Sequence, residues 1–102
     1  MDKAIRTLLG FARRAGKVAA GTEATLAAVK SGRAKLVLVA EDSSENSRKE
    51  IINKTEHYRL PVLMVTTRKE LGEAIGLSPR SAVAVLDQGF GKAIAEAQEE
   101  RV

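Results

Sequence analysis

Basic side chains recur at helical spacing near the start of the chain. Lys3, Arg6, Arg13 and Lys17, with Gly10 between them, follow one another in steps of three and four residues, which places them on one stripe of a helix. A stripe of one charge sign repels itself, and phosphate groups would supply the missing counter-charge. A solvated helix face explains the same residues without a ligand. Because no acidic residue lies between residues 3 and 22, the pattern favours a nucleic-acid partner.

A second basic group, Lys30, Arg33 and Lys35, surrounds Gly32. Its members follow a predicted helix, where the helix dipole favours cations whatever the function, so this group is weaker evidence. Residues 1–35 hold eight Lys and Arg against two acidic residues, a balance of +6, and the remainder holds nine against eleven, a balance of −2. One end of the molecule is therefore expected to be basic.

Carboxylates are the other candidates for chemistry. Glu41 and Asp42 follow one aliphatic run and Asp87 follows another, and strand ends are where α/β sheets place ligands such as Mg²⁺. Helix caps explain Asp42 and Asp87 better, and a solvated loop explains Glu41. No phosphate-binding or dinucleotide-binding glycine motif is present, and the glycines of residues 89–92 fit a tight turn between a strand and a helix. The sequence places no serine or cysteine nucleophile with His57. We expect no enzymatic activity.

The composition limits the class of protein. A chain of 102 residues, 44% of them hydrophobic, fits one domain spanning 1–102. The absence of cysteine and the single histidine exclude disulfides and argue against a zinc site, so no metal or cofactor is expected. The apolar runs are too short to cross a membrane and the first residues lack an apolar signal region. We therefore expect a cytoplasmic protein that does not enter a membrane.

Helical and strand-like segments alternate along the chain. Helices are predicted over about 3–15, from Gly21-Thr22 to Gly32 with Thr22 as cap, after caps offered at 42–44, from the capping box 67–70 to Gly76, and after Asp87. Strands are predicted at 18–20, 36–40, 62–65 and 82–86, the last three as buried strands. This order predicts an α/β fold, a single-domain three-layer α/β/α sandwich with a small, mostly parallel mixed sheet.

Several motifs in this order resemble the kink-turn-binding ribosomal protein superfamily, and in particular its bacterial YlxQ-type branch. The motifs that carry the resemblance are 16–18, 21–32, 34–42, 60–62, 67–76 and 82–85, with 8–17 and 87–90 pointing to the branch. Together they cover about residues 5–95. The resemblance implies non-catalytic binding to structured RNA, with ribosomal RNA and ribosomal proteins as the expected partners of a ribosome-associated protein.

The resemblance also implies where RNA would bind. Gly21 and Thr22 match the helix start at which backbone N–H groups meet the RNA, Arg68 matches a basic contact, and Arg80 falls in an RNA-facing loop. The expected RNA-binding residues are these four together with Lys17, Glu23 and, as electrostatic support, Arg13, Arg6 and Lys3.

This chain differs from the superfamily's pattern immediately after Gly-Thr. Where kink-turn binders typically carry an Asn-Glu pair and then a lysine, it has Glu23, Ala24 and Ala27. Alanine can neither read a base nor pair with a phosphate. The difference argues against the usual kink-turn specificity and leaves RNA binding in general as the expectation. The alternative is a protein–protein interaction module on the same scaffold.

Overall fold

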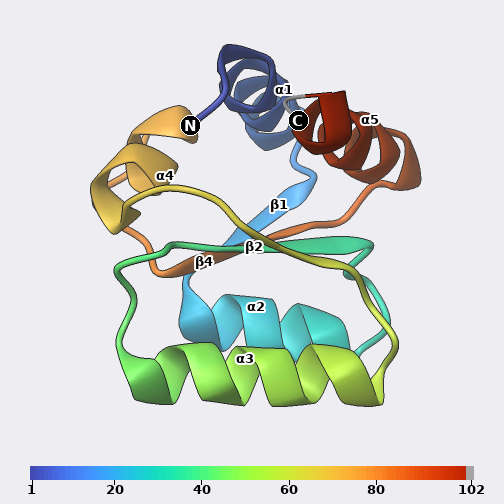
Figure 1. The fold of residues 1–102 in the computed structure, drawn as a ribbon. Helices are drawn as coiled ribbons and strands as arrows, with labels where there is room; N and C mark the ends of the chain where they lie inside the picture. The colour runs from blue at the N-terminus through green and yellow to red at the C-terminus, as the bar shows by residue number, and fades with distance from the viewer. Residues whose placement is uncertain (101–102) are drawn as a thin grey trace.

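The computed structural model describes the backbone of residues 1–100 and the side chains of residues 1–99. Helices and strands alternate in the order α1 (Lys3–Arg14), β1 (Val18–Ala20), α2 (Thr22–Lys30), β2 (Leu36–Val39), α3 (Glu45–His57), β3 (Val62–Met64), α4 (Arg68–Ala74), β4 (Ala82–Val85) and α5 (Gln88–Glu100). Helices α1, α4 and α5 cover one face of the sheet, and α2 and α3 cover the other (Figure 1). The predicted three-layer α/β/α arrangement is confirmed.

The sheet is mixed, with the strand order β1-β4-β2-β3. Strand β4 lies between β1 and β2 and is antiparallel to both, whereas β2 and β3 are parallel. Strands β1, β2 and β3 therefore run in one direction, but only one of the three neighbouring pairs is parallel. The prediction of a mostly parallel sheet is wrong in this respect.

The reversal of β4 follows from the short connection before it. Helix α4 has seven residues, and the Arg80 N–H donates to the Arg68 carbonyl oxygen at 3.1 Å. The chain thus returns to the edge of the sheet at which β3 ended. A parallel strand would have required a longer crossover to the opposite end of the sheet. Strand β4 therefore starts at the end where β3 stops and runs antiparallel to β2.

The core consists of two clusters on the two faces of the sheet. Leu36 and Leu38 pack with residues of α1, α4 and α5, while Val37 and Val39 pack with α2 and α3. This alternation is the two-residue period of a strand that is buried on both faces. The prediction of a buried strand fails for β3, because β3 is an outer strand of the sheet and leaves Met64 38% exposed.

The helix starts agree with the sequence at some positions and differ at others. Ser44 caps α3 by accepting from Ser47 N at 3.2 Å, and Asp87 accepts from Phe90 N at 2.9 Å in the first turn of α5. Thr22 was predicted as the cap of α2, but the cap is Gly21, and Thr22 is the first helical residue. Asp42 does not cap α3; its carboxylate accepts a hydrogen bond from the backbone N–H of Arg68, the first residue of α4.

Candidate nucleic-acid interface

Three helices begin along one edge of the sheet. Strands β1, β2 and β3 end at this edge, and α2, α3 and α4 start there, on the left in Figure 1. The first turn of a helix has N–H groups without intrahelical partners and carries the positive end of the helix dipole. The arrangement is therefore suited to an anionic ligand. We call it the helix-start edge.

Helix α2 starts without a side-chain cap. Within the described residues, a first-turn backbone N–H of each of the other four helices donates a hydrogen bond to a side-chain oxygen, that of Asp2, Ser44, Thr67 or Asp87. Helix α2 has no such bond, because its cap is Gly21. Gly21 adopts φ 102° and ψ 163°, a conformation that residues with a Cβ atom rarely adopt. The glycine thus leaves the N–H groups of α2 open to an outside acceptor.

Arg80 lies directly beside this helix start. A Cβ atom on Gly21 would be 3.8 Å from Cδ of Arg80, so the arginine stem passes over the glycine. The Nη1 group donates to Ser78 Oγ at 2.6 Å and to the Ser78 carbonyl oxygen at 3.0 Å. These bonds hold the half-buried side chain in place, so a cation is positioned next to the open N–H groups.

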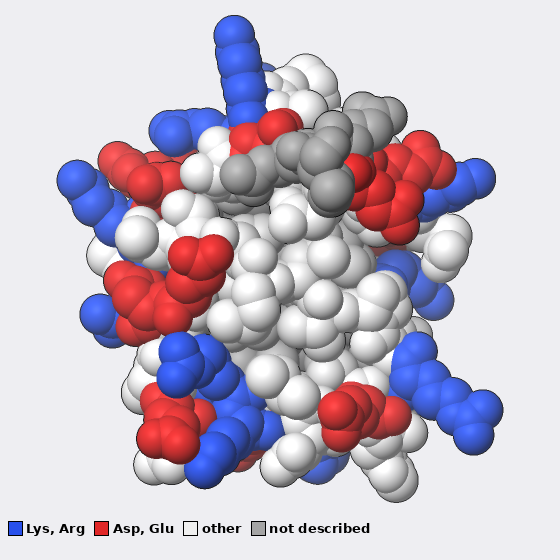
Figure 2. All heavy atoms as spheres, in the orientation of Figure 1, with Lys and Arg blue, Asp and Glu red and all other residues white. Residues whose placement is uncertain are grey.

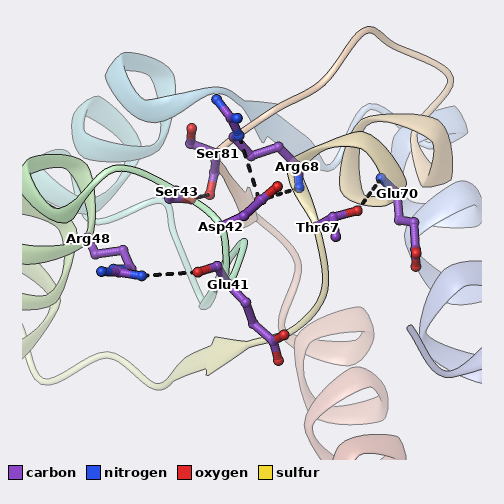
Figure 3. Close-up of polar contacts among 8 residues, drawn as sticks. All are labelled: Glu41, Asp42, Ser43, Arg48, Thr67, Arg68, Glu70 and Ser81. Atoms are coloured by element: carbon purple, nitrogen blue, oxygen red, sulfur yellow. Dashed lines mark hydrogen bonds and ion pairs between the residues drawn. The ribbon is translucent and has the colours of Figure 1, made fainter.

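Arg68 completes the basic part of the edge and shares an oxygen of Asp42. Asp42 Oδ1 accepts from Arg68 N at 2.8 Å and lies 3.6 Å from Arg68 Nε (Figure 3). Both side chains are about half exposed, and exposed ion pairs contribute roughly 0–1 kcal/mol. A phosphate can therefore compete with Asp42 for this guanidinium at little energetic cost.

The loop after β2 is fixed between its neighbours. Ser43 Oγ donates to the Ser81 carbonyl oxygen at 3.0 Å, and Arg48 Nη1 donates to the Glu41 carbonyl oxygen at 3.0 Å (Figure 3). Glu41 N donates to the Thr66 carbonyl oxygen at 2.6 Å. Sequence reasoning did not identify Ser43, Ser81 or Arg48 as part of the site, since these contacts join segments up to 38 residues apart.

The edge brings together five of the nine expected RNA-binding residues. Gly21, Thr22 and Glu23 start α2, with Arg68 and Arg80 beside them. Lys17 lies elsewhere, because its carbonyl oxygen accepts from Leu86 N at 2.8 Å, beyond the far end of β4. β4 runs from the helix-start edge, where Ala82 O accepts from Gly21 N, and its four residues span about 10 Å.

The three basic residues expected on α1 lie over a face of the sheet rather than at the edge. Lys3, Arg6 and Arg13 are exposed, and Ile5, Leu9 and Ala12 are buried, so α1 is an amphipathic helix. The start of α1 lies near α4, where the Met1 ammonium group is 3.1 Å from Glu70 Oε2. Arg13 is about 15 Å further along the helix than Lys3.

The carboxylate of Glu70 in α4 has a lowered pKa. The Thr66 hydroxyl donates to Glu70 Oε2 at 2.7 Å, and this hydrogen bond, followed by the Met1 ammonium group, holds the pKa of Glu70 below its usual value of 4.5. The predicted capping box is half confirmed: Thr67 accepts from Glu70 N, but the Glu70 carboxylate binds Thr66.

The carboxylates considered for magnesium do not form a site. Glu41 and Asp42 follow β2, whereas Asp87 follows β4, which runs in the opposite direction, so Asp87 lies at the other edge. Within residues 1–99 no group of three or more His, Asp or Glu side chains is arranged to hold a metal ion. No helix of the described part is long and apolar enough to span a bilayer.

Comparison with known proteins identifies the family. Residues 3–95 match the model of the Ribosomal protein L7Ae/L30e/S12e/Gadd45 family. The chain is similar to "RNA-binding protein YlxQ" of Bacillus subtilis (strain 168), with 45% identity over 83 residues that cover 81% of this chain and 83% of that protein. It is also similar to "RNA-binding protein YlxQ" of Enterococcus faecium, with 39% identity over 85 residues that cover 83% and 82%.

Two solved structures share the fold. The structure of a protein with unknown function from Bacillus halodurans C has a TM-score of 0.92 and 33% identity, covering 96% of this chain and 99% of that one. The Giardia lamblia 15.5kD RNA binding protein has a TM-score of 0.77 and 20% identity, covering 95% and 83%, and supports the fold alone. The chain therefore belongs to the Ribosomal protein L7Ae/L30e/S12e/Gadd45 family.

Proposed function

We propose that this protein is a non-catalytic RNA-binding protein that recognises structured RNA through the helix-start edge. The observation that carries the proposal is the open start of α2 at Gly21, with the Arg80 stem held against it. Backbone N–H groups and a fixed guanidinium are donors suited to phosphate oxygens. The names of the relatives from Bacillus subtilis and Enterococcus faecium, RNA-binding proteins both, support the ligand class.

The proposal includes ribosomal RNA as the ligand, with ribosomal proteins as neighbours, and a cytoplasmic location. It does not include strong kink-turn specificity. Ala24 and Ala27 lie on α2 without a polar side-chain group, and Glu23 is exposed in the first turn of this helix. Recognition would thus depend on backbone donors and arginines, which respond to the shape and phosphate positions of the RNA rather than to its sequence.

Substitution of the basic residues tests the site. A Lys17/Arg68/Arg80 triple alanine variant is expected to lose affinity for a structured ribosomal RNA fragment in a gel-shift titration and to remain folded. Because Lys17 lies at the opposite end of the sheet, the Arg68→Ala/Arg80→Ala double variant should reproduce most of the loss. On a hairpin fragment without a single-stranded tail, Lys17→Ala is the matched control. Unchanged binding by the double variant would refute the helix-start edge as the site.

The acidic residues of the edge favour one second candidate, a protein-interaction module. Glu23, Glu41 and Asp42 are exposed at the helix-start edge, so the edge has a mixed charge rather than a strongly basic one. Crosslinking in cells followed by sequencing of the attached RNA separates the two functions. Recovery of no RNA above background would favour the interaction module, whereas recovery of defined ribosomal segments supports RNA binding.

A further inference from the structure

A second group of basic residues lies opposite the helix-start edge. The turn after α2 and the turn before β1 meet the end of β4 there, because Lys35 N donates to the Val85 carbonyl oxygen and Leu86 N donates to the Lys17 carbonyl oxygen, both at 2.8 Å. The turn after α3 lies at the same end, since Val37 N donates to the Pro61 carbonyl oxygen at 3.1 Å. We call this end of the molecule the basic pole. Its cations are Lys17, Lys30, Arg33, Lys35 and Arg59. This end of the sheet is on the right in Figure 1.

Few carboxylates offset these cations. The carboxylates at the pole are Glu56, in the last turn of α3, and Asp87. Asp87 accepts a hydrogen bond from Phe90 N at 2.9 Å. The negative ends of α2 and α3 account for Lys30 and for part of the remaining charge. They do not account for Lys35, which leads into β2 rather than ending a helix. The pole therefore has positive charge beyond what its helix ends require.

A cavity of about 420 Å³ opens between the same turns. Its apolar lining includes Val29, Ala34 and Leu60, and its polar lining includes Lys35 and Gln88. The volume falls within the range of roughly 300–1,000 Å³ that is typical of small-ligand sites. The cavity thus combines an apolar wall, an amide and a cation at the basic pole.

An exposed aromatic ring completes the lining. Tyr58 lines the cavity and remains 42% exposed, and His57 packs edge-on against its ring at 5.0 Å between centroids. Exposed aromatic rings beside cations are the usual means of stacking an unpaired base while its phosphate is neutralised. An acidic peptide would use the cations but would leave the ring without a planar partner, so the lining favours a nucleotide.

We propose that the basic pole binds an unpaired nucleotide of single-stranded RNA. The base stacks on Tyr58 and contacts the apolar lining, the Gln88 amide faces the base edge, and Lys35 with its neighbouring cations contacts the phosphates. The inference rests on the proposed function for its ligand class and adds a second contact at the opposite end. The protein would thereby connect a structured RNA element to an adjacent single strand.

Titration of the ¹⁵N-labelled full chain with the single-stranded pentanucleotide U5 tests the inference. The amide shifts are expected at Gly32, Lys35, Leu60 and Gln88 and not at Gly21. Tyr58→Ala should weaken binding by about ten-fold or more, in line with loss of base stacking, whereas Tyr58→Phe should retain most of it. Lys35→Ala should also weaken binding and reduce the dependence on salt concentration.

Lys49→Ala is the charge control, because Lys49 is paired with Glu45 at 3.1 Å near the other end of α3. Shifts that map to the helix-start edge, equal binding by Tyr58→Ala, or no binding of U5 at low salt would each overturn the inference. So would a poly-glutamate peptide that produced the same shifts as U5. Structured-RNA binding through Arg68 and Arg80 is measured separately, so either proposal can fail without the other.

Discussion

Gly21 shows how much of the site depends on one residue. Its positive φ turns the chain from β1 into α2, and its lack of a side chain leaves the helix start open beside Arg80. The Gly-Thr pair correctly indicated a helix start from sequence. The assignment of the cap to Thr22 was wrong. Threonine is a common helix cap, and residue types alone do not give the backbone angle that makes Gly21 the cap.

Gly21→Ala is expected to destabilise the fold and to weaken RNA binding. Alanine at this backbone conformation costs about 1–3 kcal/mol, and any relaxation would move the first N–H groups of α2. Urea unfolding and a gel-shift titration measure the two effects. Gly16→Ala is the matched control, because Gly16 also has a positive φ, of 72°, with no atom within 4 Å of an added Cβ. Equal loss of RNA affinity in both variants would contradict a specific role of Gly21.

At the scale of elements, α4 and the loop after it determine the position of Arg80. Gly72 lies in α4, and an added Cβ atom would collide with the Ser78 carbonyl oxygen and lie 2.9 Å from the Leu77 carbonyl oxygen. Both obstacles are backbone atoms, which cannot move aside as a flexible side chain can. The close approach of helix and loop therefore sets the path of residues 77–80.

Gly72→Ala is expected to lower the free energy of unfolding by about 1–3 kcal/mol, the usual cost of overpacking. It should also weaken RNA binding by displacing Arg80, although residue 72 is buried. Gly10→Ala is the control: it is another glycine within a helix, but an added Cβ would meet the Ala74 carbonyl oxygen at an ordinary 3.6 Å. Thermal unfolding of both variants checks this, and a Gly72→Ala protein as stable as Gly10→Ala would contradict it.

The start of α4 also predicts a dependence of stability on pH. The pKa of Glu70 is lowered from 4.5 in the folded state, so its contribution is fully present above about pH 4.5 and is lost as pH falls through the folded-state pKa. Glu70→Gln should therefore be less stable than the parent near neutral pH, with the difference shrinking below pH 4.5. Urea unfolding across this range measures it.

Thr66→Val provides the control for this pH dependence. Its hydroxyl donates the hydrogen bond that lowers the Glu70 pKa most, so its removal should raise the pKa of Glu70 toward 4.5. A carboxyl titration followed by NMR measures that pKa directly. A Glu70 pKa that stayed the same in Thr66→Val would show that the N-terminal ammonium group dominates instead.

At the scale of the whole molecule, charge and backbone donors are separated. The helix-start edge combines open N–H groups with three arginines among carboxylates, and the basic pole lies at the other end of the sheet. On the face drawn in Figure 2, basic and acidic side chains are interspersed around the periphery. Charge totals along the chain correctly indicated an excess of cations in residues 1–35. They did not indicate that much of this excess lies away from the edge at Gly21.

The salt dependence of RNA binding should reflect this separation. For a hairpin RNA without a single-stranded tail, Arg80→Ala should reduce the slope of log affinity against log salt by about 1. Lys17→Ala should leave the slope unchanged, because Lys17 lies at the far end of β4. Titrations at several salt concentrations check both values. An equal reduction by Lys17→Ala would indicate that hairpin RNA also contacts the basic pole.

The sequence by itself determined the alternation of helices and strands, the three layers and most helix ends, because these follow from local periodicity, caps and glycines. It also identified Gly21, Arg68 and Arg80 as site candidates, through motif order. Only the tertiary structure decided the direction of β4, the Ser43–Ser81 contact and the placement of Lys17 opposite Gly21. These features depend on strand pairing between distant segments, and pairing partners are chosen by packing of the whole sheet rather than by local residue preference.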